Sequence, residues 1–222
     1  MSGLPEAVLF DMDGLLVSTE ETWFEVETEI MADLGTPWGP EHQAALVGGP
    51  LDHSARYMRD LAGRRDITAG DIATLLLDGM ERRLREGPVR WMAGAEDLLL
   101  EVGRAGLPVG LVSSSYRRVM NAVLDAIGHQ HFQVTVSADD VPRTKPHPDP
   151  YLAAARALRV PPARCVALED SATGATAARA AGCITIVVPS VAPVPRDVAD
   201  HQVPSLVGLG LAGLRELVGA RA

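Results

Sequence analysis

The 222-residue sequence is short of cysteine, of basic residues and of long apolar runs. Its two cysteines, Cys165 and Cys183, stand in apolar surroundings and lack the spacing of a metal site, so we expect two reduced core thiols. No apolar run approaches the roughly 18 residues of a membrane span. A signal peptide begins with a basic region ahead of its apolar stretch, and the N-terminus of this sequence has no such basic region. These absences predict a cytoplasmic protein with no membrane partner.

Lysine and arginine total 20 against 29 acidic residues, which gives a net charge of −9. Because nucleic acids and anionic membranes attract basic surfaces, neither is an expected partner. A few cations gathered in one place would still suffice to bind a phosphate. No coiled-coil pattern is present, and we expect a monomer or a weak homodimer. The length allows one good-sized domain, or a core domain with a smaller insert.

Apolar, β-rich runs alternate with longer amphipathic stretches over most of the chain. Five of these runs predict strands, at 7–11, 108–113, 132–137, 165–170 and 184–188. Most of them are nearly continuous apolar runs, which is typical of parallel strands buried on both faces. The amphipathic stretches predict helices at 94–104, 116–127, 149–159 and 173–181. Strand alternating with helix predicts an α/β fold with a doubly wound parallel sheet.

The segment 18–88 interrupts this alternation. It contains no convincing strand and predicts helices instead, at 20–34, 40–47, 51–62 and 69–86. We therefore expect a helical cap domain, 18–88, inserted into a core domain made of 1–17 and 89–222. The proline-rich stretch 189–204 predicts a surface loop before a last short helix at 209–218.

Polar residues stand at the ends of predicted strands, where open parallel sheets carry their functional groups, and a lysine stands in the loop ahead of the helix predicted at 149–159. The set comprises Asp11, Asp13, Ser113, Ser114, Ser115, Lys145, Glu169 and Asp170. Taken singly, an aspartate here forms a turn, a serine caps a helix and a lysine is solvated. Taken together, four carboxylates at neighbouring strand ends would repel one another unless a cation lay among them.

Mg²⁺ fits such a set, because it prefers carboxylates, carbonyls, waters and the oxygens of a substrate phosphate. Zinc does not, since no histidine or cysteine stands at these positions. A lysine, hydroxyls and backbone N–H groups beside the metal would neutralise the oxygens of a transferred phosphoryl group. One carboxylate of the Asp11–Asp13 pair can attack phosphorus, and the other can pass protons. The expected partner is a small phosphorylated substrate.

Four motifs occur in order along nearly the whole chain: FDMDG, LVSSS, KPHPDPY and LEDSATGATAARAAG. Each motif alone is weak or moderate, whereas the ordered set is specific. With these motifs the sequence resembles the haloacid dehalogenase superfamily, in its branch of phosphatases and β-phosphoglucomutase-like proteins with a helical cap. The resemblance implies a Rossmann-like core and an Mg²⁺-dependent phosphatase acting on a small sugar phosphate through an aspartyl-phosphate.

The resemblance also implies roles for the four acidic residues. Asp11 would be the nucleophile and a metal ligand. Asp13 would be the general acid and base, with its backbone carbonyl on the metal. Asp170 would ligate Mg²⁺, and Glu169 would be a further ligand or lie just behind the ligands.

The phosphate would be held, by the same resemblance, by Ser113, the N–H of Ser114 and Lys145, with the lysine bridging the phosphate and the nucleophile. One departure stands in the turn after the first motif. The family often has an Asp-Ser-Glu triplet where this sequence has Ser18, Thr19 and Glu20. The change leaves the catalytic set intact and would alter the cap hinge or the hold on the substrate.

Several relatives within the superfamily fit less well. Asp13 argues against carbon–halogen cleavage, because the dehalogenases lack an acid there. Phosphonate cleavage needs a cap lysine, and 18–88 contains none. A phosphoryl mutase stays open as an alternative, although Trp23 stands where β-phosphoglucomutase has a cap histidine. A regulatory protein that binds a phosphometabolite without catalysis is the third alternative.

Four residues of the inserted segment are candidates for contacting the substrate: Glu20, Trp23, Gly49 and Arg56. Trp23 would stack on a sugar or apolar group, or pack in the cap core. Gly48 and Gly49 would allow a close approach to the substrate, or form a simple turn between helices. The cap is the expected specificity element, since closing it would exclude water from the site.

Overall fold

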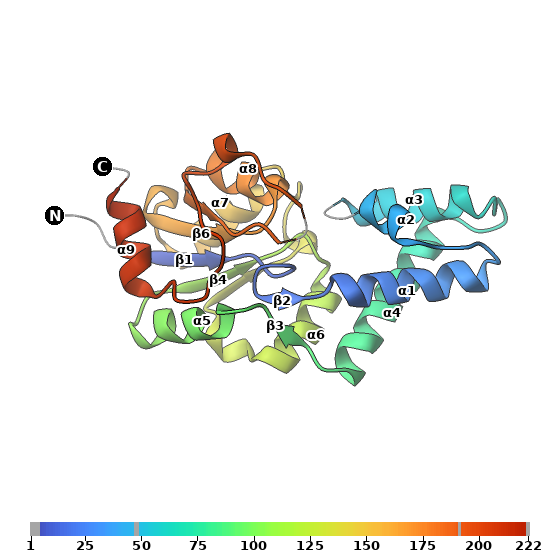
Figure 1. Cartoon of the computed structure of the whole chain (residues 1–222), viewed down its shortest axis with the longest axis horizontal. Helices are drawn as coiled ribbons and strands as arrows, with labels where there is room; N and C mark the ends of the chain where they lie inside the picture. Colours follow the sequence, from blue (N-terminus) through green and yellow to red (C-terminus); the bar gives the residue numbers. More distant parts are fainter. Residues whose placement is uncertain (1–4, 47–48, 191, 221–222) are drawn as a thin grey trace. The chain divides into compact units, whose positions relative to one another are not determined.

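The computed structural model describes residues 5–46, 49–190 and 192–220 (Figure 1). The chain forms two compact units. The first comprises Met1–Ser18, Arg90–Arg117 and Gly128–Ala222, and the second comprises Thr19–Val89 together with Arg118–Ile127. The domain boundaries predicted from the sequence, at 18 and 88, stay a proposal.

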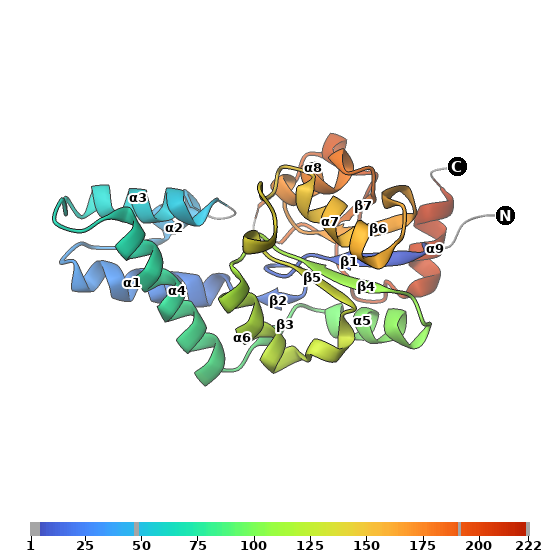
Figure 2. The same cartoon turned by 180° about the vertical axis from the view of Figure 1, so that it is seen from behind.

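A six-stranded parallel sheet, in the order β5-β4-β1-β6-β7-β8, forms the centre of the first unit (Figure 2). Its strands are β1 (Ala7–Phe10), β4 (Val109–Val112), β5 (Val134–Val136), β6 (Cys165–Glu169), β7 (Ile184–Val187) and β8 (His201–Gln202). Four of them, β1, β4, β6 and β7, are buried along their whole length. Continuous apolar runs therefore become central strands, as predicted.

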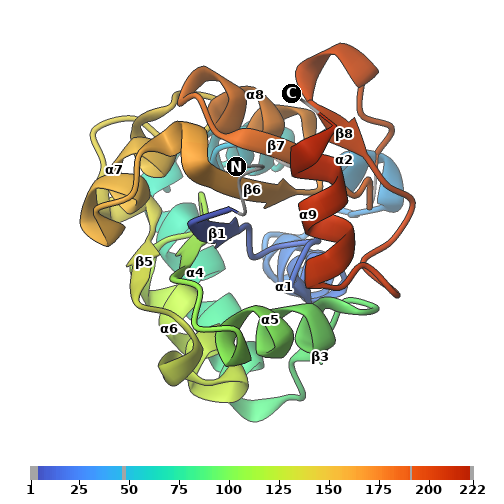
Figure 3. The ribbon, with the colours of Figure 1, turned by 90° about the vertical axis from the view of Figure 1, so that its left-hand side faces the viewer.

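Helices of the first unit lie on both faces of the sheet. They are α5 (Ala95–Arg104), α7 (Asp149–Leu158), α8 (Ala172–Ala180) and α9 (Leu211–Gly219). Short 3₁₀ helices connect other elements: η1 (His129–His131), η2 (Ala138–Asp140), η3 (Pro162–Arg164) and η4 (Arg196–Val198). Figure 3 shows α7 and α8 on one side of the strands and α5 on the other. The predicted doubly wound α/β fold is confirmed.

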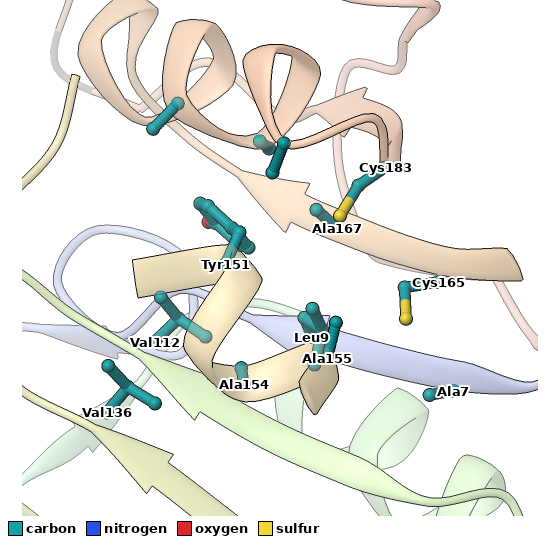
Figure 4. Packing of buried hydrophobic residues seen from close by; sticks show 13 residues of the cluster. Ala7, Leu9, Val112, Val136, Tyr151, Ala154, Ala155, Cys165, Ala167 and Cys183 are labelled. Carbon is teal, nitrogen blue, oxygen red and sulfur yellow. The ribbon is translucent and has the colours of Figure 1, made fainter. Parts of the chain in front are cut away.

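The space between the sheet and α7 holds a cluster of buried, mostly apolar side chains (Figure 4). Tyr151 of α7 is fully buried there, close to Leu9 of β1 and Val112 of β4. Cys165 and Cys183 are free and buried in the same cluster, as predicted for core thiols.

Two short pairings were not predicted. Strands β2 (Val17–Ser18) and β3 (Arg90–Trp91) form an antiparallel ladder in the first unit. Residues 189–204, predicted as a plain surface loop, contain η4 and strand β8, which pairs in parallel with β7. The loop prediction was wrong at β8, because two residues are too few to show an alternating pattern and the partner strand supplies the pairing.

Helices make up the second unit. They are α1 (Glu20–Asp33), α2 (Pro40–Ala44), α3 (Leu51–Leu61), α4 (Ala69–Glu86) and most of α6 (Arg117–Ile127). Helix α4 begins with a capping box, in which Thr68 Oγ1 accepts from the Asp71 N–H and the Asp71 carboxylate accepts from the Thr68 N–H. None of the helices in the described part of the chain has the length and hydrophobicity to cross a membrane.

Two arginines tie α6 to α4. Arg118 lies 2.7 Å from both Asp78 and Glu81 of α4, and Arg85 lies 2.7 Å from Asp125 of α6. These contacts account for the place of Arg118–Ile127 in the second unit, which the sequence pattern did not indicate.

Candidate active site

The candidate site lies at the carboxyl ends of three neighbouring strands. Asp11 directly follows β1, Ser113 follows β4, and Glu169 ends β6. Because β4, β1 and β6 are adjacent and parallel, their ends meet at one edge of the sheet. The backbone is fixed as well, since the Asp11 N–H donates to the Leu168 carbonyl at 3.0 Å.

Lys145 joins these strand ends. Its Nζ donates to Asp11 Oδ1 at 2.5 Å, to Glu169 Oε1 at 2.6 Å and to the Val112 carbonyl at 2.9 Å. The lysine is buried, at 8% exposure. Burial alone would lower the pKa of Lys145, but the charges of Asp11 and Glu169 outweigh burial and raise that pKa. The lysine is therefore a fixed positive charge in the site.

Asp11 lies in an environment with an excess of negative charge. Burial raises the pKa of Asp11 well above its usual value, and Lys145 acts in the opposite direction. Glu169, Asp170 and Asp13 raise the pKa of Asp11 further. One lysine thus does not compensate the acidic groups around it, and the site favours an additional cation.

Glu169 is fully buried and held on all sides. Besides Lys145, the Tyr151 hydroxyl donates to its Oε1, and Ser171 Oγ lies 3.3 Å from its Oε2. Burial and the Glu169 charge raise the pKa of Tyr151, so the phenol stays a donor. A Cβ on Gly174 would lie 2.0 Å from the carboxyl group, so only glycine fits there. These contacts leave Glu169 one orientation.

Asp13 is held by serines of the next strand end. Its Oδ2 accepts from Ser113 Oγ at 3.1 Å and from Ser115 Oγ at 2.8 Å. The Ser115 N–H in turn donates to Ser113 Oγ at 2.9 Å. Ser114 between them is exposed. The structure thus joins Asp13 to the predicted phosphate-binding turn, with two donors on one carboxylate oxygen.

Asp170 is held from a third direction. Ser190 Oγ, beyond the end of β7, donates to Asp170 Oδ2 at 2.5 Å. Burial and the nearby Glu169 raise the pKa of Asp170 to about 6, while the Ser190 hydrogen bond acts in the opposite direction. Gly14 packs against the same carboxylate with a φ of +83°.

Three carboxylates of this site suit a metal ion. Asp11, Glu169 and Asp170 each offer an oxygen, and these atoms lie within 4.8 Å of one another. An all-oxygen, all-acidic set matches the preference of Mg²⁺ and not that of zinc. The side chain of Asp13 lies toward the serines instead, which leaves its predicted role on the metal to its backbone carbonyl.

The four candidate residues of the second unit, Glu20, Trp23, Gly49 and Arg56, each have different neighbours. Glu20 begins α1, and its carbonyl accepts from Gln43. Trp23 is half-buried. Arg56 is exposed and 3.8 Å from Asp52. Gly49 is exposed in a turn before α3, where its N–H donates to a carbonyl at 2.9 Å, and Gly48 lies outside the described residues.

Sequence reasoning assigned no individual role to four side chains that hold the site residues: Ser115, which it named among the polar residues at strand ends, and Tyr151, Ser171 and Ser190. The first three stand inside the quoted motifs or beside their named residues, so their position was available although their contacts were not. Ser190 stands in the stretch interpreted as a loop and carried no signal.

Known proteins resemble this chain in sequence. The sequence model of a family described as haloacid dehalogenase-like hydrolase matches residues 8–188. The putative phosphatase YhcW of Bacillus subtilis (strain 168) is 32% identical over 215 residues, or 93% of this chain and 94% of that protein. Hexitol phosphatase B of Escherichia coli (strain K12) is 34% identical over 191 residues, or 83% of each chain.

A solved structure is similar in both sequence and fold. It is a mutant of CbbY from Rhodobacter sphaeroides in complex with xylulose-(1,5)-bisphosphate. The TM-score is 0.81 at 32% identity, and the match covers 94% of this chain and 98% of that one.

Proposed function

The chain belongs to the haloacid dehalogenase-like hydrolases, as its motifs predicted, and from this membership we propose that it is an Mg²⁺-dependent phosphatase of a small sugar phosphate. The prediction of an enzyme of the phosphatase class is confirmed. The metal, the intermediate and the substrate are the proposed part.

One observation carries the proposal. A buried carboxylate, Asp11, is paired with Lys145 at 2.5 Å and lies among further carboxylates that suit a hard cation. A nucleophile that meets a dianionic phosphate needs such positive charge beside it, because the reaction concentrates negative charge on the phosphoryl oxygens.

The proposed reaction has two steps. Asp11 attacks phosphorus while the bond to the leaving oxygen breaks, and Asp13 donates a proton to that oxygen. Asp13, now a carboxylate, takes a proton from a water that attacks the aspartyl-phosphate, which releases phosphate and restores Asp11. The Ser115 hydroxyl holds Asp13 in place for both transfers, while the single proton of the Ser113 hydroxyl turns from Asp13 to the phosphate when the substrate binds.

Asp11, Asp170, Glu169 and the Asp13 carbonyl would hold Mg²⁺. When bound, the ion supplies positive charge to the oxygens of the substrate phosphate. Lys145 supplies the remaining charge from within the sheet edge, and Ser113 and the Ser114 N–H bind the phosphate.

A sugar phosphate is the proposed substrate class. Hexitol phosphatase B is named for a polyol substrate, and CbbY was crystallised with a sugar bisphosphate. Both are more than 30% identical to this chain. We propose that Glu20, Trp23, Gly49 and Arg56 contact the sugar, as the sequence analysis predicted.

The test is phosphate release from a panel of sugar phosphates, nucleotides and p-nitrophenyl phosphate, with Mg²⁺ or with EDTA. We expect turnover of one or a few sugar phosphates that EDTA abolishes. Asp11→Asn should lower the rate by at least about a thousandfold, while Asp97→Asn, an exposed aspartate of α5, should leave it unchanged. A hydroxylamine-sensitive phosphoenzyme should form in the parent protein and not in the Asn variant.

An Asp11→Asn variant that retains full activity contradicts the proposed intermediate. Slow phosphate release with isomerised product, stimulated by a sugar bisphosphate, would indicate the mutase alternative. A failure on the whole panel would favour the regulatory binding protein.

A further inference from the structure

Ser190 contacts a residue of the candidate site and lies outside all four sequence motifs. Its hydroxyl donates to Asp170 Oδ2 at 2.5 Å across 20 residues of sequence. The serine itself is exposed. Its side chain therefore contributes little to the packing of the core, and the hydrogen bond to a site carboxylate is its notable contact.

The backbone near Ser190 is anchored to the same strand end. The Val188 N–H donates to the Glu169 carbonyl at 2.8 Å, one residue before Asp170. Pro189 follows and restricts the backbone between this anchor and Ser190. The hydroxyl is thus held close to Asp170 by the fold, rather than reaching it from a free loop.

Gly14 of the first motif supplies the space for this contact. A Cβ on Gly14 would lie 2.2 Å from Asp170 Oδ2 and 2.9 Å from Ser190 Oγ. The turn after β1, the end of β6 and the segment after β7 therefore close around one carboxylate oxygen.

The hydrogen bond also gives the two carboxylate oxygens of Asp170 different surroundings. Oδ2 accepts from Ser190, and among the described residues Oδ1 has no hydrogen-bond partner. A carboxylate whose one oxygen is fixed by a donor presents the other in a defined direction, and such outer contacts tune metal affinity.

We propose that Ser190 is a positioning residue that orients Asp170 for the divalent cation. The inference rests on the proposed function, because it takes Asp170 as a ligand. Ser190 acts through Asp170 and does not touch the substrate, so its effect belongs to the affinity for the metal.

The experiment measures Mn²⁺ binding to the full chain, from the electron paramagnetic resonance signal of the unbound ion. Mn²⁺ prefers the same oxygen ligands as Mg²⁺. We expect Ser190→Ala to weaken binding about tenfold and Ser190→Thr, which keeps the hydroxyl, to bind like the parent protein. Ser205→Ala is the matched control, because among the described residues the Ser205 hydroxyl only accepts from the Val207 N–H within its own loop.

A second readout separates positioning from folding. The melting temperature of Ser190→Ala in EDTA should equal that of the parent protein. Under saturating Mg²⁺ its turnover should approach the parent rate, with the metal dependence shifted to higher concentration.

Asp170→Asn distinguishes a failure of the role proposed for Ser190 from a failure of the proposed metal site. Parent-like Mn²⁺ affinity in Ser190→Ala, with affinity lost in Asp170→Asn, overturns the role of Ser190 alone. Parent-like affinity in Asp170→Asn overturns the proposed metal site and the inference with it. Equal losses in Ser190→Ala and Ser190→Thr overturn the assignment to the hydroxyl.

Discussion

Glu27 is a buried acid away from the candidate active site. It lies on α1 at 5% exposure, and Trp38 Nε1 donates to its Oε2 at 3.2 Å. Burial, aided by the charge of Glu20, raises its pKa from 4.5 to about 7, while the Trp38 hydrogen bond opposes the shift. The folded protein therefore holds this proton over a pH range in which the unfolded chain releases it.

Stability should fall as pH rises through that range. Below pH 4.5 Glu27 is protonated in both states and has no effect. Between pH 4.5 and about 7 only the unfolded chain releases the proton, and this release lowers the free energy of the unfolded state. Above about pH 7 both states have released it, and the loss of stability is complete. The size of this loss is on the order of 3 kcal/mol.

Glu27→Gln removes the titrating group and keeps an oxygen for Trp38. We expect the variant to lose less stability than the parent protein between pH 5 and pH 8. Urea unfolding followed by tryptophan fluorescence at both pH values measures the difference. Glu86→Gln, at an exposed position of α4, should behave like the parent protein. The prediction fails if Glu27→Gln and the parent protein show the same pH dependence.

At the scale of an element, α8 shows how a helix makes room for a site. Ser171 caps its N-terminus by accepting from the Gly174 N–H at 3.1 Å, and Gly174 faces the Glu169 carboxylate without a side chain. A helical glycine ordinarily costs up to about 1 kcal/mol relative to alanine. Here the missing side chain of Gly174 leaves room for the helix to begin directly against the buried Glu169 carboxylate.

Gly174→Ala should therefore destabilise the protein by about 1–3 kcal/mol, because the new methyl group must displace Glu169. Phosphatase activity should fall with it, since Lys145 would lose a partner. Urea unfolding and a rate assay on the same preparation measure both effects.

Gly103→Ala is the matched control in another helix. Apart from its neighbours in the backbone of α5, no atom of the described residues lies within 4 Å of a Cβ at Gly103, so the change should be neutral or stabilise the protein by less than about 1 kcal/mol. Equal stability and activity of the two variants would show that Glu169 can move freely.

The elements that the sequence predicted are those with a strong local pattern. The wholly buried strands β1, β4, β6 and β7 give continuous apolar runs, and their positions follow within a few residues. Strands β2, β3 and β8 have two residues each, too few for any pattern. Tertiary pairing alone creates them.

The same distinction holds within the site. Asp11, Glu169 and Asp170 were predicted because they stand beside strand ends, and the structure gathers them. The contacts of Tyr151 and Ser190 join residues 18 and 20 positions apart. No spacing in the sequence marks such a pair, since the contact depends on how α7 and the segment after β7 lie against β6.

For the whole molecule, binding of the proposed Mg²⁺ and the folding equilibrium should be linked. A ligand that binds only the folded chain stabilises it by about 2.7 kcal/mol at a concentration 100 times its dissociation constant. For a chain of this size that corresponds to roughly 5–10 °C in melting temperature. Removing the metal should lower the melting temperature by the same amount.

Thermal unfolding in Mg²⁺ and in EDTA, at equal ionic strength, measures this linkage. Matched ionic strength matters because the net charge of −9 gives any cation a general effect. Asp170→Asn should melt alike in both solutions. An equal Mg²⁺ shift in that variant would assign the effect to screening rather than to the site.

The N–H donors of Lys145 are all engaged within the protein. An ammonium group has three N–H donors, and Asp11, Val112 and Glu169 already accept all three. A phosphate that binds this lysine must therefore displace one of these acceptors, so its arrival is an exchange rather than an addition. Such an exchange adds little affinity. Inorganic phosphate, the product, should then bind weakly and leave readily, and the enzyme would resist inhibition by what it produces.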